Sequence, residues 1–178
     1  MTTHYFSFNA HMMTMMLMIG LQALLFLIGH ATAEDYVPKN VYGETLQPCS
    51  SAGSALTGYT RSGSCVDLQD DVGSHHICIE LSSMSSSGQN FCQVTGQSNW
   101  CSSDMPCHEN KYQSCQIENW CVCQWAFASY IEKAGGCDAI QHIQCDAINM
   151  QALSAYASST QDKHKEALQC IYERCMIS

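Results

Sequence analysis

A small set of cysteines, together with one histidine and one aspartate, has the residue types and spacing that could support chemistry. Cys121-x-Cys123 brings two thiols close together in the chain, and His75 precedes Cys78 by three residues. Thiolate and imidazole suit zinc or copper, and a thiolate beside a base is a nucleophile. The complete candidate site is Cys49, Arg61, Cys65, Asp71, His75, Cys78, Trp120, Cys121 and Cys123.

The first interpretation of these residues is structural. Cysteines in an oxidising compartment usually form disulfides, which would join loops to the neighbouring strand and helix. Asp70 and Asp71 stand just before Gly73, an arrangement typical of a turn in which the aspartate bonds its own backbone. On this interpretation His75 is a hydrogen-bonded strand residue.

The second interpretation is a metal site. Cys121 and Cys123 would lie on one face of a strand, and His75 and Cys78 would complete four ligands, with Asp71 orienting the histidine. The spacing matches no zinc knuckle, and the other cysteine-rich run, Cys101-x5-Cys107-x7-Cys115, does not either. No cofactor is predicted from the residues, and zinc or copper stays as the alternative.

The third interpretation is thiol chemistry. A cysteine at a helix start has its thiolate stabilised by the helix dipole. His75 would be the general base and Arg61 an anion clamp, with Ser64 as a bystander. The chain has no C-x-x-C and no G-x-S-x-G motif. The residues therefore do not decide whether the protein is an enzyme.

The N-terminal segment predicts the compartment. Residues 12–29 are nearly all apolar, and Ala31-Thr-Ala33 is a small-x-small pattern, so we expect a signal peptide over residues 1–33. The alternative is retention of this run as a membrane anchor. We therefore predict a secreted protein, or one in the lumen of the secretory pathway.

All thirteen cysteines follow the expected cleavage site, so disulfides are their expected state. Thirteen is odd, so at least one thiol is free, bound to a ligand or in an intermolecular disulfide. The four cysteines within residues 83–119 predict two local disulfides. The disulfide candidates outside the site are Cys92, Cys101, Cys107, Cys115, Cys137, Cys145, Cys170 and Cys175.

The charge of the chain excludes one class of partner. The net charge is −9, with only seven lysines and arginines. Nucleic-acid binding needs basic residues for phosphate contacts, so we expect none, and no membrane association after signal cleavage. The partner itself is not indicated.

The pattern of short elements predicts a small, loop-rich α+β domain over residues 34–158, with short strands and two to three helices. A strand is expected over 75–82 and a helix with Phe127, Tyr130, Ile131 and Ala134 on one face, ending at Gly135. A strand is expected within residues 137–148, and residues 148–157 are expected to be helical. An amphipathic helix is expected over 159–178, with Ser159 and Asp162 as a capping-box variant and Cys170 outside its apolar stripe.

Four ordered motifs carry a family resemblance: NVYGETLQPCS at 40–50, TGYTRSGSC at 57–65, DDVGSHHIC at 70–78 and NWCVCQWAF at 119–127. Together they resemble the bacterial family called domain of unknown function 2237, over about residues 40–156. Residues at matching positions are Asn40, Gly43, Pro48, Cys49, Thr57, Gly58, Arg61, Gly63, Cys65, Asp71, Gly73, His75, Cys78, Trp120, Cys121 and Cys123. Ser64 replaces the first cysteine of the family's Cys-Cys pair.

The resemblance implies a fold but no activity. We therefore expect a secreted, acidic, cysteine-rich domain, stabilised by disulfides, with a structural or binding role. The alternative is a metal-binding protein or thiol-dependent enzyme that uses the shared cysteine and histidine cluster.

Overall fold

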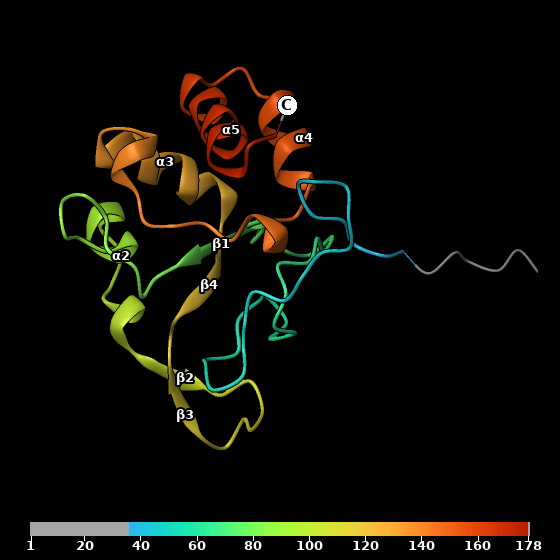
Figure 1. Ribbon diagram of the computed structural model, residues 1–178, viewed down its shortest axis with the longest axis vertical. Helices are drawn as coiled ribbons and strands as arrows, with labels where there is room; N and C mark the ends of the chain where they lie inside the picture. The colour runs from blue at the N-terminus through green and yellow to red at the C-terminus, as the bar shows by residue number, and fades with distance from the viewer. Residues whose placement is uncertain (1–35, 178) are drawn as a thin grey trace, which may run out of the picture. The chain divides into compact units, whose positions relative to one another are not determined.

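Two antiparallel strands cross the middle of the fold (Figure 1), and Cys78, Trp120 and Cys121 of the candidate site lie within them. The computed structural model describes residues 36–177, and one compact unit spans Val37–Ser178. The predicted signal peptide, residues 1–33, lies outside the described residues. Among the described helices, none is long and apolar enough to cross a membrane.

Strands β1 (Ile77–Glu80) and β4 (Asn119–Val122) form an antiparallel pair. Side chains alternate across a strand, so Ile77 and Ile79 share the core face with their partners on β4. Cys78 and Cys121 are directly opposite each other on the other face. The strand expected within residues 75–82 is confirmed, over a shorter range.

Helix α3 (Gln124–Ala134) follows β4 with only Cys123 between them. Phe127, Tyr130 and Ile131 are buried, as their helical spacing predicts. The helix ends at Gly135, whose φ of 94° is the left-handed conformation that glycine adopts without a Cβ penalty. Both the helix and its end were predicted from the sequence.

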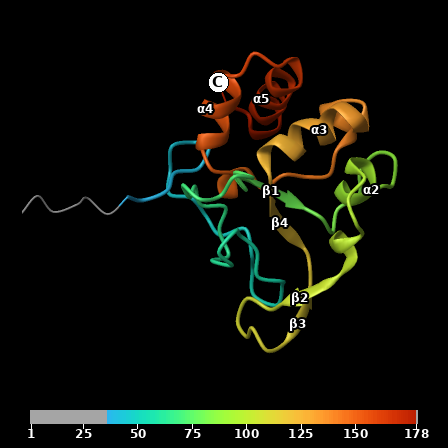
Figure 2. The ribbon, with the colours of Figure 1, turned by 180° about the vertical axis from the view of Figure 1, so that it is seen from behind.

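Helices α4 (Gln151–Ala157) and α5 (Asp162–Cys175) pack on each other, and α5 also packs on α3 (Figure 2). Two disulfides attach α5 to the preceding segment: Cys137 to Cys170, and Cys145 to Cys175. Cys170 is buried against Cys137, so its expected place outside the buried stripe is wrong. Cys170 lies on the buried face of α5 together with Ala167 and Ile171, where it meets its disulfide partner.

Two features expected near the C-terminus are also wrong. Residues 137–148 form the 3₁₀ turns η2 (Cys137–Ala139) and η3 (Cys145–Ala147) rather than a strand, and only Ile143 bridges to Ile79. No side chain caps α5. Ser159 instead accepts the backbone N–H of Gln161 and bonds the ring of His164, so its hydroxyl is engaged before the first turn.

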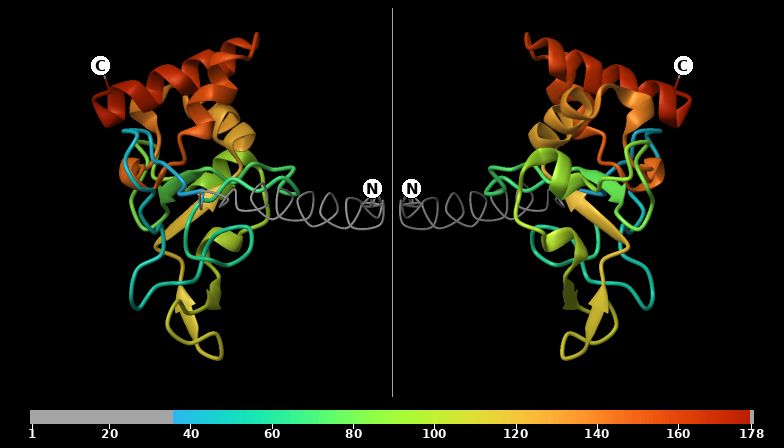
Figure 3. Two further views of the ribbon diagram at one scale, coloured as in Figure 1. Left: turned by 90° about the vertical axis from the view of Figure 1, so that its right-hand side faces the viewer. Right: turned by 90° about the vertical axis from the view of Figure 1, so that its left-hand side faces the viewer.

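Residues 83–119 contain the two local disulfides that were predicted, Cys92–Cys101 and Cys107–Cys115. This segment also folds into short elements. They are α2 (Phe91–Thr95), η1 (Trp100–Ser102), β2 (Asp104–Pro106) and β3 (Ser114–Gln116). The β2–β3 hairpin lies at the end of the unit away from α5 (Figure 3).

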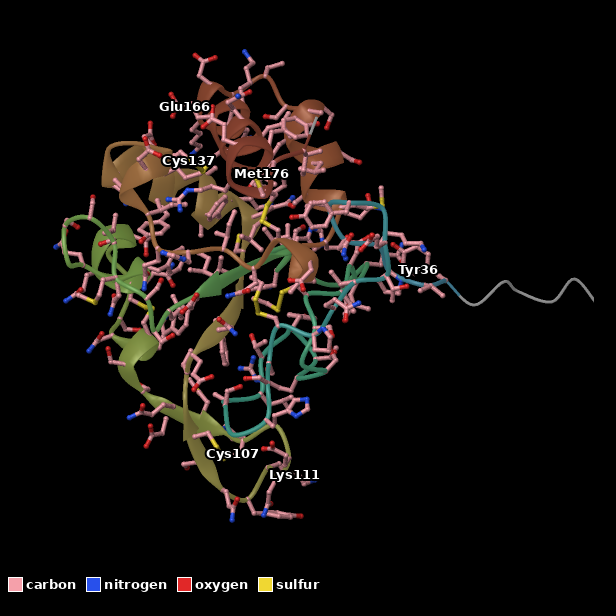
Figure 4. All side chains as sticks on the ribbon, viewed as in Figure 1. Tyr36, Cys107, Lys111, Cys137, Glu166 and Met176 are labelled. Carbon is pink, nitrogen blue, oxygen red and sulfur yellow. A yellow bond between two sulfur atoms is a disulfide. The ribbon has the colours of Figure 1, made fainter. Side chains whose placement is uncertain are left out.

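The α+β fold class is confirmed: short antiparallel strands and helices surround one main core, with six disulfides. Tyr130, Tyr156, Phe91 and Phe127 are its largest buried side chains. Sulfur atoms are spread from Cys107, near the hairpin, to Cys137, at the helical end (Figure 4). The disulfides thus reach every part of the described fold.

Candidate functional site

Two buried disulfides contain four of the five cysteines in the candidate site. Cys49 is bonded to Cys78 and Cys65 to Cys121. The two bonds lie side by side, with the sulfurs of Cys49, Cys65 and Cys78 within 4.8 Å of one another. Cys78 and Cys121 therefore present no thiolate to a metal, which leaves His75 and Cys123 from the four ligands considered above.

Cys123 is the only free cysteine of the thirteen, all of which lie in the described residues. It is the N-cap residue of α3, partly exposed, and makes no side-chain cap bond to the helix. The N-terminus of a helix carries partial positive charge, and the first turn of α3 contains no acidic residue. The positive end of the helix dipole therefore lies beside the Cys123 sulfur.

His75 is held by a buried carboxylate. Asp71 Oδ1 lies 2.7 Å from His75 Nδ1, and the Asp71 side chain also accepts the backbone N–H groups of His75 and Gly73, at 2.8 and 3.1 Å. Burial by itself raises the pKa of Asp71, but the bonds and charge from His75 and the Gly73 N–H outweigh it, so the pKa lies below its usual value. The carboxylate is thus charged and aimed at the imidazole.

Two further groups fix the imidazole plane. The ring of Tyr59 stacks on it at 5.9 Å between centroids. On Gly73, a Cβ would lie 2.6 Å from His75 Cε1, so only glycine permits this approach. Nδ1 is engaged by Asp71, and Nε2 forms no hydrogen bond with the described residues. His75 therefore has one nitrogen free for other chemistry.

A single backbone bond joins the His75 loop to the start of α3. The N–H of Gln124 donates to the carbonyl oxygen of Ser74 at 3.0 Å. Ser74 precedes His75 and Gln124 follows Cys123, so this bond brings the two chemical residues to one place. Both line the same small pocket, whose volume is about 80 Å³.

The rest of this pocket is largely apolar and aromatic. We call it the Cys123 pocket; it is lined by His75, Phe91, Gln97, Trp100, Trp120, Cys121, Val122, Cys123 and Ala126. Trp100 packs on Trp120 at 5.8 Å and on Phe91 at 6.2 Å between ring centroids. Arg61 lies over Trp120, with its guanidinium carbon 4.9 Å from the ring centroid. The pocket can hold a small group beside a thiol and an imidazole.

Cys123 also affects a residue behind the pocket. The Tyr156 hydroxyl donates to the backbone carbonyl of Gln124. The pKa of Tyr156 is raised well above its usual value, first by burial and then by the negative charge of a Cys123 thiolate. The tyrosine is therefore neutral, and it fixes the first residue of α3 against α4.

His76, the neighbour of His75, has a different environment. It is buried, with Nδ1 2.9 Å from Gln124 Oε1 and Nε2 3.0 Å from Asp67 Oδ1. Both nitrogens are occupied, so His76 joins the loop to α3 and has no atom available to a ligand. Adjacent histidines thus have separate roles that their sequence does not distinguish.

Larger hollows lie away from the candidate site, and the two largest described are these. A groove of about 690 Å³ runs between α3 and α5, lined by Glu132, Glu166 and Glu173 with the Cys137–Cys170 disulfide. A second hollow, of about 460 Å³, is lined by Trp125 and by His164. Neither combines a free thiol with a base, so size alone does not identify a chemical site here.

His164 is part of a hydrogen-bonded turn. Its Nδ1 lies 2.7 Å from Ser159 Oγ, which also accepts the backbone N–H of Gln161. Burial first, and the charge of Lys163 second, lower the pKa of His164. The hydrogen bond to Ser159 supports a structural role.

The structure brings together Asp71, His75, Trp120, Cys121 and Cys123, with Arg61 against Trp120. It places Cys49, Cys65 and Cys78 beneath, in disulfides. The sequence analysis missed Phe91, Trp100 and Tyr59. Asn90 and Gln93 form a capping box around the start of α2, and that N-x-x-Q pattern could have identified a helix carrying Phe91.

The comparisons with known proteins identify a family. No curated protein matches the chain. A family model described as an uncharacterised protein conserved in bacteria, DUF2237, matches residues 39–165. That match contains the Cys123 pocket and ends before Cys170 and Cys175. The chain therefore belongs to the DUF2237 family.

Proposed function

We propose that this chain is a secreted or secretory-lumen domain with a binding role, and that the Cys123 pocket is its binding site. One observation carries the proposal: the single unpaired thiol of thirteen cysteines lies in a pocket beside a histidine held by a buried carboxylate. A purely structural domain needs no such arrangement, because a free thiol contributes no cross-link.

The proposed compartment is supported by the disulfides. Six disulfides within residues 36–177 are typical of an oxidising environment. Expression of the full chain in a secreting host, followed by intact mass measurement, tests this. Secretion predicts a mature chain that begins at Glu34. A chain that stays inside the cell with residues 1–33 attached would contradict the proposal.

The binding pocket is tested by the access of a small probe to Cys123. The native protein is treated with iodoacetamide, the modified cysteine is identified by peptide mass mapping, and tryptophan emission is followed. We expect one modification, at Cys123, and a change in emission because Trp100 and Trp120 line the pocket. Modification only after denaturation would show that the pocket admits no ligand and would leave a structural role alone.

A thiol-dependent enzyme is the second candidate, because it would use the same three residues: Cys123 as nucleophile, His75 as base and Asp71 to orient it. A binding site and an enzyme differ in stoichiometry. A binding protein takes up one equivalent of a ligand, whereas an enzyme consumes many equivalents. Counting the equivalents consumed per Cys123 distinguishes the two.

A further inference from the structure

We propose that the Cys123 pocket captures small disulfides that bear a carboxylate, retaining one half of the molecule as a mixed disulfide on Cys123. The inference rests on the proposed binding site and adds the chemical class of the ligand. It requires a free thiol, room for a small group, and a cation near the pocket.

Cys123 is the one sulfur able to start such an exchange. The other twelve cysteines are already in disulfides, so none of them has a thiol to react. Exchange needs an accessible thiolate. Cys123 is partly exposed at the N-terminus of α3 and shares its pocket with His75.

The pocket limits the ligand to a small group. Its volume of about 80 Å³ exceeds the space of a single water, which needs roughly 10–15 Å³. Phe91, Trp100 and Trp120 form apolar walls that suit the CH₂–S portion of a small thiol. A bulky peptide disulfide would have to leave most of its atoms outside.

Arg61 gives the reason for a carboxylate. Its guanidinium lies on Trp120, a wall of the pocket, while its side chain remains exposed to solvent. One guanidinium N–H donates to the carbonyl oxygen of Gly58, which fixes the direction of the arginine side chain. The other N–H donors of the guanidinium take no part in that bond. The net charge of −9 opposes any anion at long range, so the preference must come from this local cation.

The exchange transfers one half of the small disulfide to Cys123. The Cys123 thiol passes its proton by way of water to the free nitrogen of His75, which lines the same pocket, and the thiolate sulfur attacks one sulfur of the small disulfide. The S–S bond of the ligand breaks as the new bond to Cys123 forms. The leaving half departs as a thiolate and takes up a proton, so Cys123 is oxidised and the released half is reduced.

The test uses cystine as the carboxylate-bearing probe and cystamine, its cationic counterpart without carboxylates. The mature secreted protein is mixed with each, and adducts are followed by intact mass and mapped by peptide mass. We expect one half-cystine on Cys123, removed by dithiothreitol, and none on the Cys123→Ser variant. Cystine should react about threefold faster than cystamine in the wild type, and Arg61→Gln should abolish that difference.

Several outcomes would overturn the inference. An adduct on Cys65 or Cys121 would show shuffling of the neighbouring disulfide, and equal rates for the two probes would remove the carboxylate preference. Iodoacetamide labelling of native Cys123 without any half-cystine adduct would reject this ligand class while the binding pocket stands. Failure of both reagents would reject the pocket itself. Retained secretion and an unchanged unfolding transition show that each variant has folded.

Discussion

The side chain of Asp71 lies 2.7 Å from the Nδ1 atom of His75 and also accepts the backbone N–H of the same residue. One buried carboxylate thus fixes both the chain path and the ring of His75. His75 lines the same pocket as Cys123, the only unpaired cysteine among the thirteen. The bond between Asp71 and His75 thus fixes an imidazole that lines the pocket of Cys123.

Asp71 should make the protein sensitive to acid. Its pKa is lower in the folded than in the unfolded chain, so its contribution to stability is present above 3.8 and is lost as the pH falls below that value. Asp71→Asn should cost about 1–3 kcal/mol at neutral pH, because hydrogen bonds to a charged acceptor are lost. Urea unfolding at several acidic pH values should show a shallower pH dependence for this variant.

Asp70→Asn is the matched control for that experiment, since Asp70 is exposed and adjacent. It should retain the acid sensitivity of the wild type. If Asp71→Asn and Asp70→Asn lose stability in parallel with the wild type as the pH falls, the assignment to Asp71 is wrong.

Gly73→Ala should displace the imidazole of His75. The added Cβ would lie 2.6 Å from His75 Cε1, closer than van der Waals contact allows. We expect slower alkylation of native Cys123, with the twelve paired cysteines unaffected. Gly96→Ala serves as the control, because a Cβ there meets nothing within 4 Å and only its positive φ adds strain. Equal alkylation rates in both variants would argue against His75 as the assisting group.

A buried disulfide that closes a long loop should contribute more to the free energy of unfolding than the disulfide of the hairpin. Cys65–Cys121 closes 56 residues and is buried, whereas Cys107–Cys115 closes 8 residues in the hairpin. The loop-entropy relation gives about 4 kcal/mol for the first and about 2.5 kcal/mol for the second. Urea unfolding of the two paired-alanine variants measures this. A larger loss for the hairpin variant would contradict the central role of the buried disulfides.

His164 should add a second pH dependence near neutrality. Its pKa is lowered in the folded chain, so its contribution to stability is present above 6.5 and is lost as the pH falls below that value. His164→Gln should reduce the change in unfolding free energy between about pH 7.5 and pH 5.5, the range that spans an ordinary histidine. The exposed His142→Gln is the control and should behave as the wild type. An unchanged pH dependence in His164→Gln would show that His164 does not cause this loss of stability.

The parts of the fold that were predictable are those governed by periodicity. The spacing of Phe127, Tyr130 and Ile131 and the glycine after Ala134 identify α3, and the apolar run at Ile77 identifies β1. These signals act within a few residues. The segment around η2 and η3 was misread because its apolar residues follow no period, and its path is set by the disulfides to α5.

The site was predictable in composition but not in pairing. Asp71, His75 and Cys123 were all in the candidate set, yet nothing in a sequence separates Cys123 from Cys121, two residues away. Cys121 is oxidised because it points toward Cys65 from the strand, whereas Cys123 lies where the chain turns into α3. Phe91 and Trp100, two further walls of the pocket, come from residues 83–119, for which the sequence predicts only two local disulfides.

The most direct test of the account is the rate at which iodoacetamide alkylates native Cys123 in the wild type and in His75→Asn, measured from acidic to alkaline pH. We predict a wild-type rate about tenfold higher near pH 7, because His75 assists the removal of the thiol proton. His142→Asn should follow the wild type. Identical pH profiles for the wild type and His75→Asn would contradict the claim that these residues act together.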